Sequence, residues 1–126
     1  MAYSYNSKHK VITALLFIGW AIFSFVLKGD GETEYKNGQK KRVGNVSAHK
    51  NNGVFVWYYP NGKKNMQGNF VDGKREGKWI TWDRQGNKVV ECEYTNDKLN
   101  GLYTAWNANK EITFQKTYAN DVIVGN

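Results

Sequence analysis

The sequence opens with an uninterrupted apolar run over residues 11–27. This run of 17 residues carries no charge, and basic residues flank it at Lys8, Lys10 and Lys28. As a helix it would extend about 26 Å, close to the hydrocarbon thickness of a thin bilayer. A buried core helix would show polar positions every three or four residues. A cleaved signal peptide would be shorter and would end at small residues, whereas Phe25 stands near the end of this run. The run therefore predicts an uncleaved transmembrane helix.

The charged flanks predict the orientation of this helix. Two lysines precede it within residues 1–10, and one, Lys28, follows it closely. The positive-inside rule counts only basic residues, so residues 1–10 are expected in the cytoplasm and the C-terminal domain on the extracytoplasmic side of the cell membrane. Residues 28–34 then form a linker. Gly19 and Trp20, in mid-helix, are the expected helix-packing contacts, because a small residue allows another helix to approach closely.

A repeat of 24 residues occupies the rest of the chain. Glycine recurs at Gly53, Gly77, Gly101 and Gly125, and each of the three blocks that follow carries aromatic residues at the same three places. Counted from the glycine, these are position two (Phe55, Trp79, Tyr103), position five (Tyr58, Trp82, Trp106) and position seventeen (Phe70, Tyr94, Tyr118). A degenerate block at 35–46 matches 59–70. Residues 35–126 are therefore expected to hold about three and a half copies of one unit.

Each unit is typical of a β-hairpin. Asn37-Gly38 and Asn61-Gly62 predict two-residue type I′ turns, which need positive φ at both central positions. Weaker signals stand at the same place in the later blocks, and a second set marks the link to the next hairpin: Gln85-Gly86 and Asn109-Lys110, then Asp72-Gly73, Asn96-Asp97 and Asn120-Asp121. Strands are expected near 54–60, 64–71, 78–83, 88–95, 102–107 and 111–119. Because short turns make neighbouring strands antiparallel, the predicted fold is all-β: an antiparallel β-meander behind one transmembrane helix.

The second strand of each unit alternates between apolar and polar residues. Gly68 and Phe70 share one face with Met66, and Cys92 and Tyr94 occupy the equivalent positions one repeat later. Asn, Gln, Glu and Thr dominate the opposite face. The pattern predicts a sheet with one apolar and one solvated face. Cys92 falls in the apolar row, so it is interpreted as a small buried hydrophobe rather than a reactive thiol.

The segment YYPNGKKNMQGNFVDGKREGKW (58–79) resembles the MORN repeat, and particularly its bacterial variant, some relatives of which carry an antitoxin label. The matching residues are Asn61, Gly62, Lys63, Phe70, Gly73, Lys74, Gly77 and Trp79, continued by Lys98 and Gly101. The third block departs, with Asn109-Lys110 and Asp121-Val122 at the two turn positions. The likeness covers about 35–126. It implies an elongated sheet of stacked hairpins and a role in scaffolding, protein binding or membrane association; nothing in these residues supports an antitoxin role.

The chain is basic, with a formal net charge of +7 from 18 Lys and Arg against 11 Asp and Glu. Three of those lysines flank the helix, which leaves 15 basic against 11 acidic residues, or +4, for the rest. Residues 35–71 contain no acid. The candidate membrane-surface residues in this stretch are Lys36, Lys40, Lys41 and Arg42. Each could contribute about 1 kcal/mol on anionic head groups. A solubilising face is the plainer alternative, and no recognition element for nucleic acid is present.

The aromatic content, 15%, is high for a small domain. Most of these rings are expected to pack between neighbouring hairpins, as in solenoids. A single-layer sheet cannot bury both faces, however, so some should remain for a partner. The candidate partner-binding residues are Trp57, Tyr59, Trp79, Trp82 and Trp106. The four Trp of this set could alternatively stack on sugars of a wall glycan.

Little in the sequence favours catalysis. A single Cys and two His exclude an internal disulfide, a cysteine-based zinc cluster and most His-dependent sites. Glu91 and Glu93 project from one face of a strand and could tune each other's pKa, but the repeat places no nucleophile or base beside them. We expect no enzyme and no catalytic, cofactor or metal-binding residues. The sequence favours a membrane-anchored module that binds another membrane or envelope protein; an accessory subunit of a larger membrane complex and a glycan-binding module remain open.

Overall fold

The computed structural model describes residues 33–125. The predicted transmembrane helix at 11–27, its contacts Gly19 and Trp20, and the residues before it lie outside the described part and stay predictions. Within the described part there is no helix with the length and hydropathy of a membrane span.

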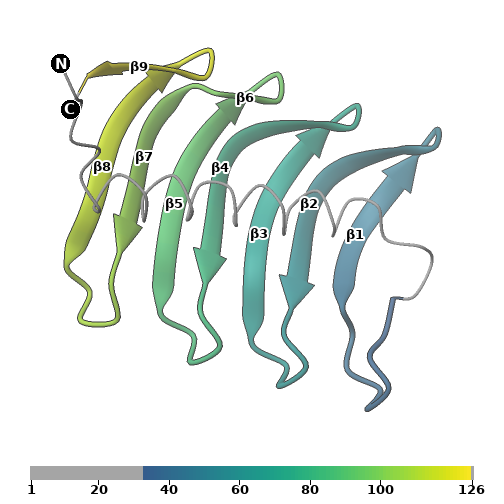
Figure 1. Ribbon diagram of the computed structural model, residues 1–126. Helices are drawn as coiled ribbons and strands as arrows, with labels where there is room; N and C mark the ends of the chain where they lie inside the picture. Colours follow the sequence, from purple (N-terminus) through teal and green to yellow (C-terminus); the bar gives the residue numbers. More distant parts are fainter. Residues whose placement is uncertain (1–32, 126) are drawn as a thin grey trace, which may run out of the picture. The chain divides into compact units, whose positions relative to one another are not determined.

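The described residues form one antiparallel sheet whose strands lie side by side in chain order (Figure 1). The strands are β1 (Arg42–Ser47), β2 (Lys50–Tyr58), β3 (Lys64–Val71), β4 (Lys74–Trp82), β5 (Lys88–Thr95), β6 (Lys98–Leu99), β7 (Gly101–Trp106), β8 (Ile112–Ala119) and β9 (Val122–Gly125). Strand β6 pairs with β5 and forms the short first part of the strand that continues as β7. The expected antiparallel β-meander is confirmed for this part of the chain.

The prediction of type I′ turns at the Asn-Gly dipeptides is wrong. At Asn61-Gly62 only the glycine has positive φ, at 83°. The Gly62 N–H donates to the Tyr59 carbonyl at 2.9 Å, and the Tyr59 N–H donates to the Lys63 carbonyl at 2.8 Å. This is the pattern of a three-residue hairpin loop that ends on a left-handed residue. Asn61 instead supports the loop with its side chain, whose Oδ1 accepts from the Lys63 N–H at 3.0 Å.

The two-residue turns with positive φ at both positions lie at the other ends of the strands, away from the three-residue loops. They are Ala48-His49, Asp72-Gly73, Asn96-Asp97 and Asn120-Asp121, with φ between 48° and 81°. These links are thus tight turns in their own right, and the long strands begin directly after them. Strand β2 starts at Lys50 and β4 at Lys74, earlier than the predicted 54 and 78.

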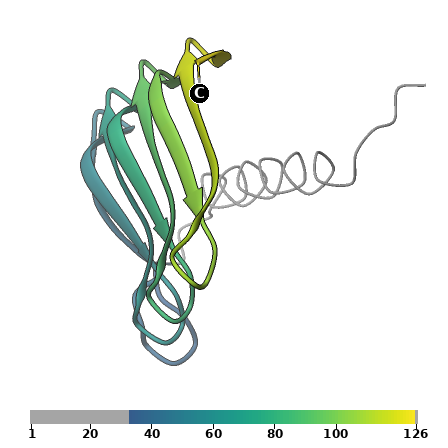
Figure 2. The same ribbon diagram turned by 90° about the vertical axis from the view of Figure 1, so that its left-hand side faces the viewer.

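In β2 and β4, the glycine that marks the start of the repeat lies at a bulge in the strand pairing. Gln67 of β3 pairs with Ile80 of β4, but Asn69, two residues further along β3, pairs with Glu76, four residues away on β4. The extra residues of β4 lie next to Gly77. The φ of Gly77 is 73°, a left-handed value at which glycine has no Cβ to clash. Gly53 stands at the same point of β2, with φ 81°. Seen edge-on in Figure 2, the sheet is one curved layer.

One face of the sheet, here called the aromatic face, holds the core. Its buried side chains are Phe55, Trp57, Phe70, Trp79, Cys92 and Tyr118. Rings of neighbouring strands meet edge to face: the centroids of Phe70 and Trp79 are 5.1 Å apart, and those of Phe55 and Phe70 are 5.3 Å apart. A Cβ on Gly68 would overlap the Trp79 indole. The apolar alternation predicted for the second strands is therefore confirmed. Because Gly68 has no side chain, it leaves room for the Trp79 ring of the next strand.

Candidate interaction surface

The opposite face, here called the polar face, has a continuous row of paired residues across the sheet. From β1 to β8 the row runs through Val43, Val56, Gln67, Ile80, Glu91, Thr104 and Gln115. Glu91, in the centre, is bound on both sides: the Lys78 and Lys88 ammonium groups each lie 2.9 Å from one of its carboxylate oxygens. These hydrogen bonds, from Lys88 first and Lys78 second, lower the Glu91 pKa. Glu91 is thus a carboxylate that is ion-paired at the surface of the sheet.

The five candidate partner-binding aromatics fall into two groups. Trp57 and Trp79 belong to the aromatic face, where each is only 3% exposed. Tyr59, Trp82 and Trp106 are half-buried and lie where the strands meet the three-residue loops. Only this second group presents ring surface, so it is the part of the set that can touch a partner without opening the core.

Each aromatic residue of the second group has a cation over its ring. The Lys88 ammonium lies 4.5 Å from the centroid of Trp106, and the Lys64 ammonium lies 5.6 Å from that of Trp82. The Arg84 guanidinium lies 6.0 Å from the Tyr59 ring. We call these three pairs the cation–aromatic row. Sequence reasoning missed the cations, although the two lysines stand 24 residues apart, in step with the two Trp.

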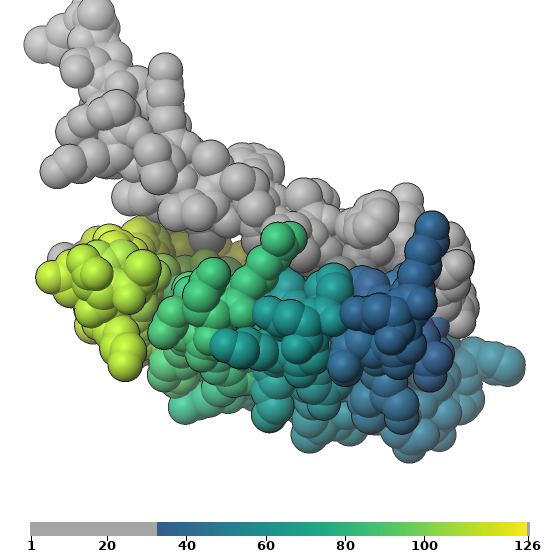
Figure 3. Space-filling view, turned by 90° about the horizontal axis from the view of Figure 1, so that it is seen from below, coloured from purple at the N-terminus to yellow at the C-terminus, as the bar shows by residue number. Residues whose placement is uncertain are grey.

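The loops beside this row are bonded to one another. The Tyr59 hydroxyl donates to the Trp82 carbonyl at 2.8 Å, and the Asn61 amide donates to the Arg84 carbonyl at 2.9 Å. Burial, followed by the nearby Asp83 carboxylate, raises the pKa of Tyr59. Figure 3 looks onto this edge, where successive loops lie next to each other. The row therefore lies at the loop end of the strands, where hydrogen bonds join each loop to the next.

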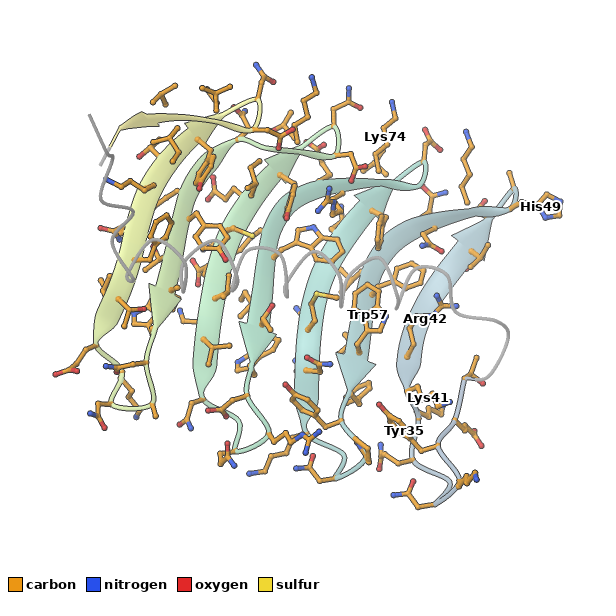
Figure 4. The ribbon with its side chains drawn as sticks, viewed as in Figure 1. Tyr35, Lys41, Arg42, His49, Trp57 and Lys74 are labelled. Carbon is orange, nitrogen blue, oxygen red and sulfur yellow. The ribbon has the colours of Figure 1, made fainter. Side chains whose placement is uncertain are left out.

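The candidate membrane-surface residues lie before and at the start of β1. Lys36 and Lys40 are exposed, whereas Lys41 and Arg42 are half-buried. The Lys41 ammonium lies 5.3 Å from the Tyr35 ring centroid (Figure 4). The Arg42 guanidinium lies 5.7 Å from the ring centroid of Phe55. The stretch thus places two of its four charges at the surface and two against aromatic rings.

A comparison with protein families matches two segments of the sheet. Residues 51–72 and 75–96 match the MORN repeat variant. Each matched segment contains a long strand, its three-residue loop, the returning strand and the start of the next tight turn. MORN repeats are generally protein- or membrane-interaction modules and generally non-catalytic. A comparison with curated proteins gives no match.

The described residues offer little for catalysis or metal binding. Between residues 33 and 125, no three His, Cys, Asp or Glu side chains gather in a way that could hold a metal ion. Burial raises the pKa of the Cys92 thiol to about 12, which keeps it protonated and inert as a nucleophile near neutral pH. The part-exposed rings and the cations against them are groups that can contribute to recognition.

Proposed function

We propose that this protein is a membrane-anchored, non-catalytic β-repeat module that binds another membrane or envelope protein through its sheet. The observation that carries the proposal is the cation–aromatic row. It consists of three part-exposed aromatic rings, each with a basic side chain against it, next to loops that are hydrogen-bonded to one another. Tyr and Trp are enriched at protein interfaces because they combine large apolar area with a polar group. The cations favour a partner surface that presents carboxylates.

The anchor part of the proposal rests on the apolar run 11–27 and its basic flanks. With that orientation the sheet would lie on the extracytoplasmic side. Lys36 and Lys40 would contact anionic head groups near the membrane, with Lys41 and Arg42 behind them.

The experiment is affinity purification of the full chain in mild detergent, with identification of the proteins that co-elute. Trp82→Ala and Trp106→Ala are expected to lower the recovery of a specific partner at least tenfold. The matched control is Leu102→Ala, which removes an exposed apolar side chain, 46% exposed, outside the cation–aromatic row. Recovery with this variant should equal that of the wild type.

Two other outcomes would replace the proposal. If recovery survives both Trp variants but is lost on Gly19→Ile or Trp20→Ala, the helix carries the contact and the chain is an accessory subunit of a membrane complex. If the purified chain binds isolated wall material without any protein partner, and Trp82→Ala abolishes this, the aromatic residues read a glycan.

A further inference from the structure

Two of the cation–aromatic pairs belong to a longer alternation of rings and lysines across the sheet. Lys64 pairs with Tyr58 in the register of β2 and β3, and its ammonium lies 5.6 Å from the Trp82 ring centroid. Lys88 pairs with Trp82 in the register of β4 and β5, and its ammonium lies 4.5 Å from the Trp106 ring centroid. Neighbouring strands thus carry, in order, Tyr58, Lys64, Trp82, Lys88 and Trp106. We call these five residues the alternating line.

The alternating line is accessible beside the polar face. Its three rings are half-buried, and its two lysines are exposed. The Lys64 ammonium donates to the Gln67 amide oxygen at 2.9 Å, and the Lys88 ammonium donates to the Glu91 carboxylate at 2.9 Å. Each lysine is thus held toward the central row of the polar face. A ligand that crosses the strands can therefore touch the whole line without opening the aromatic core.

The loop end of the sheet holds most of the net positive charge of residues 33–125. Together with Lys64 and Lys88, the loops carry eight Lys and Arg against three Asp and Glu, a net charge of +5. These loops are residues 33–41, 59–63, 83–87 and 107–111. The remaining described residues carry seven Lys and Arg against six Asp and Glu, a net charge of +1. Two of the three loop acids, Asp83 and Glu111, already accept hydrogen bonds within their own loops. The loop end therefore favours an anionic ligand, whereas the rest of the sheet has no such excess of charge.

The spacing of the rings suits one ligand conformation in particular. Neighbouring strands lie about 4.7–4.9 Å apart, so rings on every second strand recur about every 9.5 Å. A polyproline II helix has three residues per turn and a rise of about 3.1 Å per residue, so every third residue returns to the same side after about 9.3 Å. Over the two intervals from Tyr58 through Trp82 to Trp106, the rings and the helix differ by about 1 Å or less.

Other regular conformations fit the rings less well. A β-strand returns to the same side after two residues, about 6.8 Å, and is out of step with the rings by about 3 Å at the first interval. An α-helix returns to the same side after seven residues, about 10.5 Å, and is out of step by about 2 Å at the second interval. Aromatic side chains also suit a polyproline II ligand, because this helix is already extended and loses little entropy when it docks on them.

We propose that the alternating line binds an acidic, proline-rich segment of a partner protein in the polyproline II conformation. Prolines at every third position pack on the rings of Tyr58, Trp82 and Trp106, and acidic residues beside them pair with Lys64 and Lys88. This inference rests on the proposed function and deepens it, because it names the class of partner for the same surface.

The test is fluorescence anisotropy of labelled synthetic peptides titrated with the purified full chain in mild detergent. The probe repeats Pro-Glu-Ala four times. The spacing control repeats Pro-Glu-Ala-Ala four times, which keeps the number of prolines and charges but breaks the three-residue period. The charge control is the probe with each Glu replaced by Gln. The probe should bind about tenfold more tightly than either control, because one control is out of step with the rings and the other lacks carboxylates for the lysines.

Variants of the full chain locate the binding. Trp82→Ala and Trp106→Ala should each weaken binding of the probe about tenfold, as loss of an aromatic contact at an interface does. Lys64→Gln and Lys88→Gln should each weaken it and make it less sensitive to salt. The matched control is Leu102→Ala, which removes an exposed apolar side chain outside the line and should bind the probe as the wild type does. An unaltered near-ultraviolet circular dichroism spectrum shows that each variant is folded.

Three results overturn the proposal. The first is equal binding of the probe and the spacing control, because charge alone would then explain the affinity. The second is unchanged binding of the probe to both Trp variants. The third is binding of vesicles of equal phosphatidylserine and phosphatidylcholine through Trp82 and Trp106 when the probe does not bind.

The same variants separate this inference from the proposed function. If recovery of a protein partner from a detergent extract depends on Trp82 and Trp106 but the probe does not bind, only this inference falls. If the probe binds the line but recovery of a partner is unaffected by either Trp variant, the proposed function falls instead.

Discussion

Replacement of Gly68 by alanine tests whether a single glycine positions the aromatic core. Gly68 lies on β3 opposite the bulge in β4, and a Cβ at this position would overlap atoms of the Trp79 indole. Its φ is outside the left-handed range, so the backbone itself would accept alanine. The cost therefore comes only from displacement of a ring that is 3% exposed and packs edge to face on Phe70 and Tyr94.

The size of the effect follows from this geometry. Overpacking of a dense core typically costs about 1–3 kcal/mol, and here the overlap falls on a rigid indole held by two further rings. For a domain of under a hundred residues, about 2 kcal/mol corresponds to a fall of about 8–16 °C in Tm. Thermal unfolding of the full chain in mild detergent, followed by near-ultraviolet circular dichroism, measures this fall.

Two companion variants make the result decisive. Gly125→Ala adds a Cβ at 3.8 Å from the Thr117 Cβ, an ordinary contact, and should change Tm by less than about 4 °C, which corresponds to about 0.5 kcal/mol. Trp79→Phe in the Gly68→Ala background should be less destabilising than the sum of the two single changes, because the smaller ring relieves the overlap. Equal Tm values for Gly68→Ala and the wild type would refute this reasoning. Additive destabilisations by Gly68→Ala and Trp79→Phe in the double variant would also refute it, because Gly68 would then not be what positions Trp79.

Three further outcomes are expected. The lysine pairs lower the pKa of Glu91, so their stabilisation is fully present above its usual value of 4.5 and is lost as the pH falls through the lowered pKa; unfolding titrations should show this loss in the wild type but not in Glu91→Gln. The Cys92 thiol should not react with a thiol reagent at pH 8 in the folded chain and should react fully in denaturant, since burial raises its pKa to about 12; reaction of the native protein would contradict its placement in the core. Asn61→Ala should lower the free energy of unfolding by about 1 kcal/mol, because Asn61 bonds its own loop and the next, whereas Asn109→Ala, whose side chain makes no such cross-loop bond, should be near neutral in the same urea titration.

The period of the sequence was sufficient to predict the meander. Gly, aromatic and turn residues that recur every 24 positions define units of equal length, and short connections leave antiparallel neighbours as the simple arrangement. The apolar alternation correctly placed Gly68, Phe70 and Cys92 on the buried face. These predictions depend only on side-chain direction along a strand, which has a fixed period of two.

The turn geometry could not be read from dipeptides alone. Asn61-Gly62 suits a type I′ turn by propensity, but Pro60 before it fixes a negative φ, and the loop closes one residue earlier on the Tyr59 carbonyl. Conversely, Asn96-Asp97 lacks glycine and still holds positive φ at both residues, 50° and 72°. There the Glu76 carboxylate and the Arg75 carbonyl of the preceding repeat bind the turn N–H groups. Such tertiary contacts decide between turn types of similar intrinsic preference.

The candidate site was predicted by residue type but not by exposure. The sequence marks Trp57 and Trp79 as candidates beside Trp82 and Trp106, because the repeat region contains aromatic residues at several positions. Only the arrangement of strands shows that the first two pack in the core and the last two carry Lys64 and Lys88 over their rings. A cation–π contact between residues 18 positions apart has no local pattern that could announce it.

In addition to the backbone pairing of their strands, neighbouring repeats are joined by side chains at three places away from the central row of the polar face. Ring contacts join them on the aromatic face, the Asn61 amide joins the loops, and Arg75 with Asp97 joins the tight turns. The central row of the polar face contributes the ion pairs of Glu91 with its two lysines, which are surface interactions of small net value. Apart from Thr104, which is 5% exposed and accepts a hydrogen bond from the Gln115 amide, side chains there can therefore change from repeat to repeat with little loss of stability. A surface that the fold does not need for itself is the one on which a specific partner contact can be built, which is why the cation–aromatic row beside it, rather than the larger buried ring cluster, is the place to test for binding.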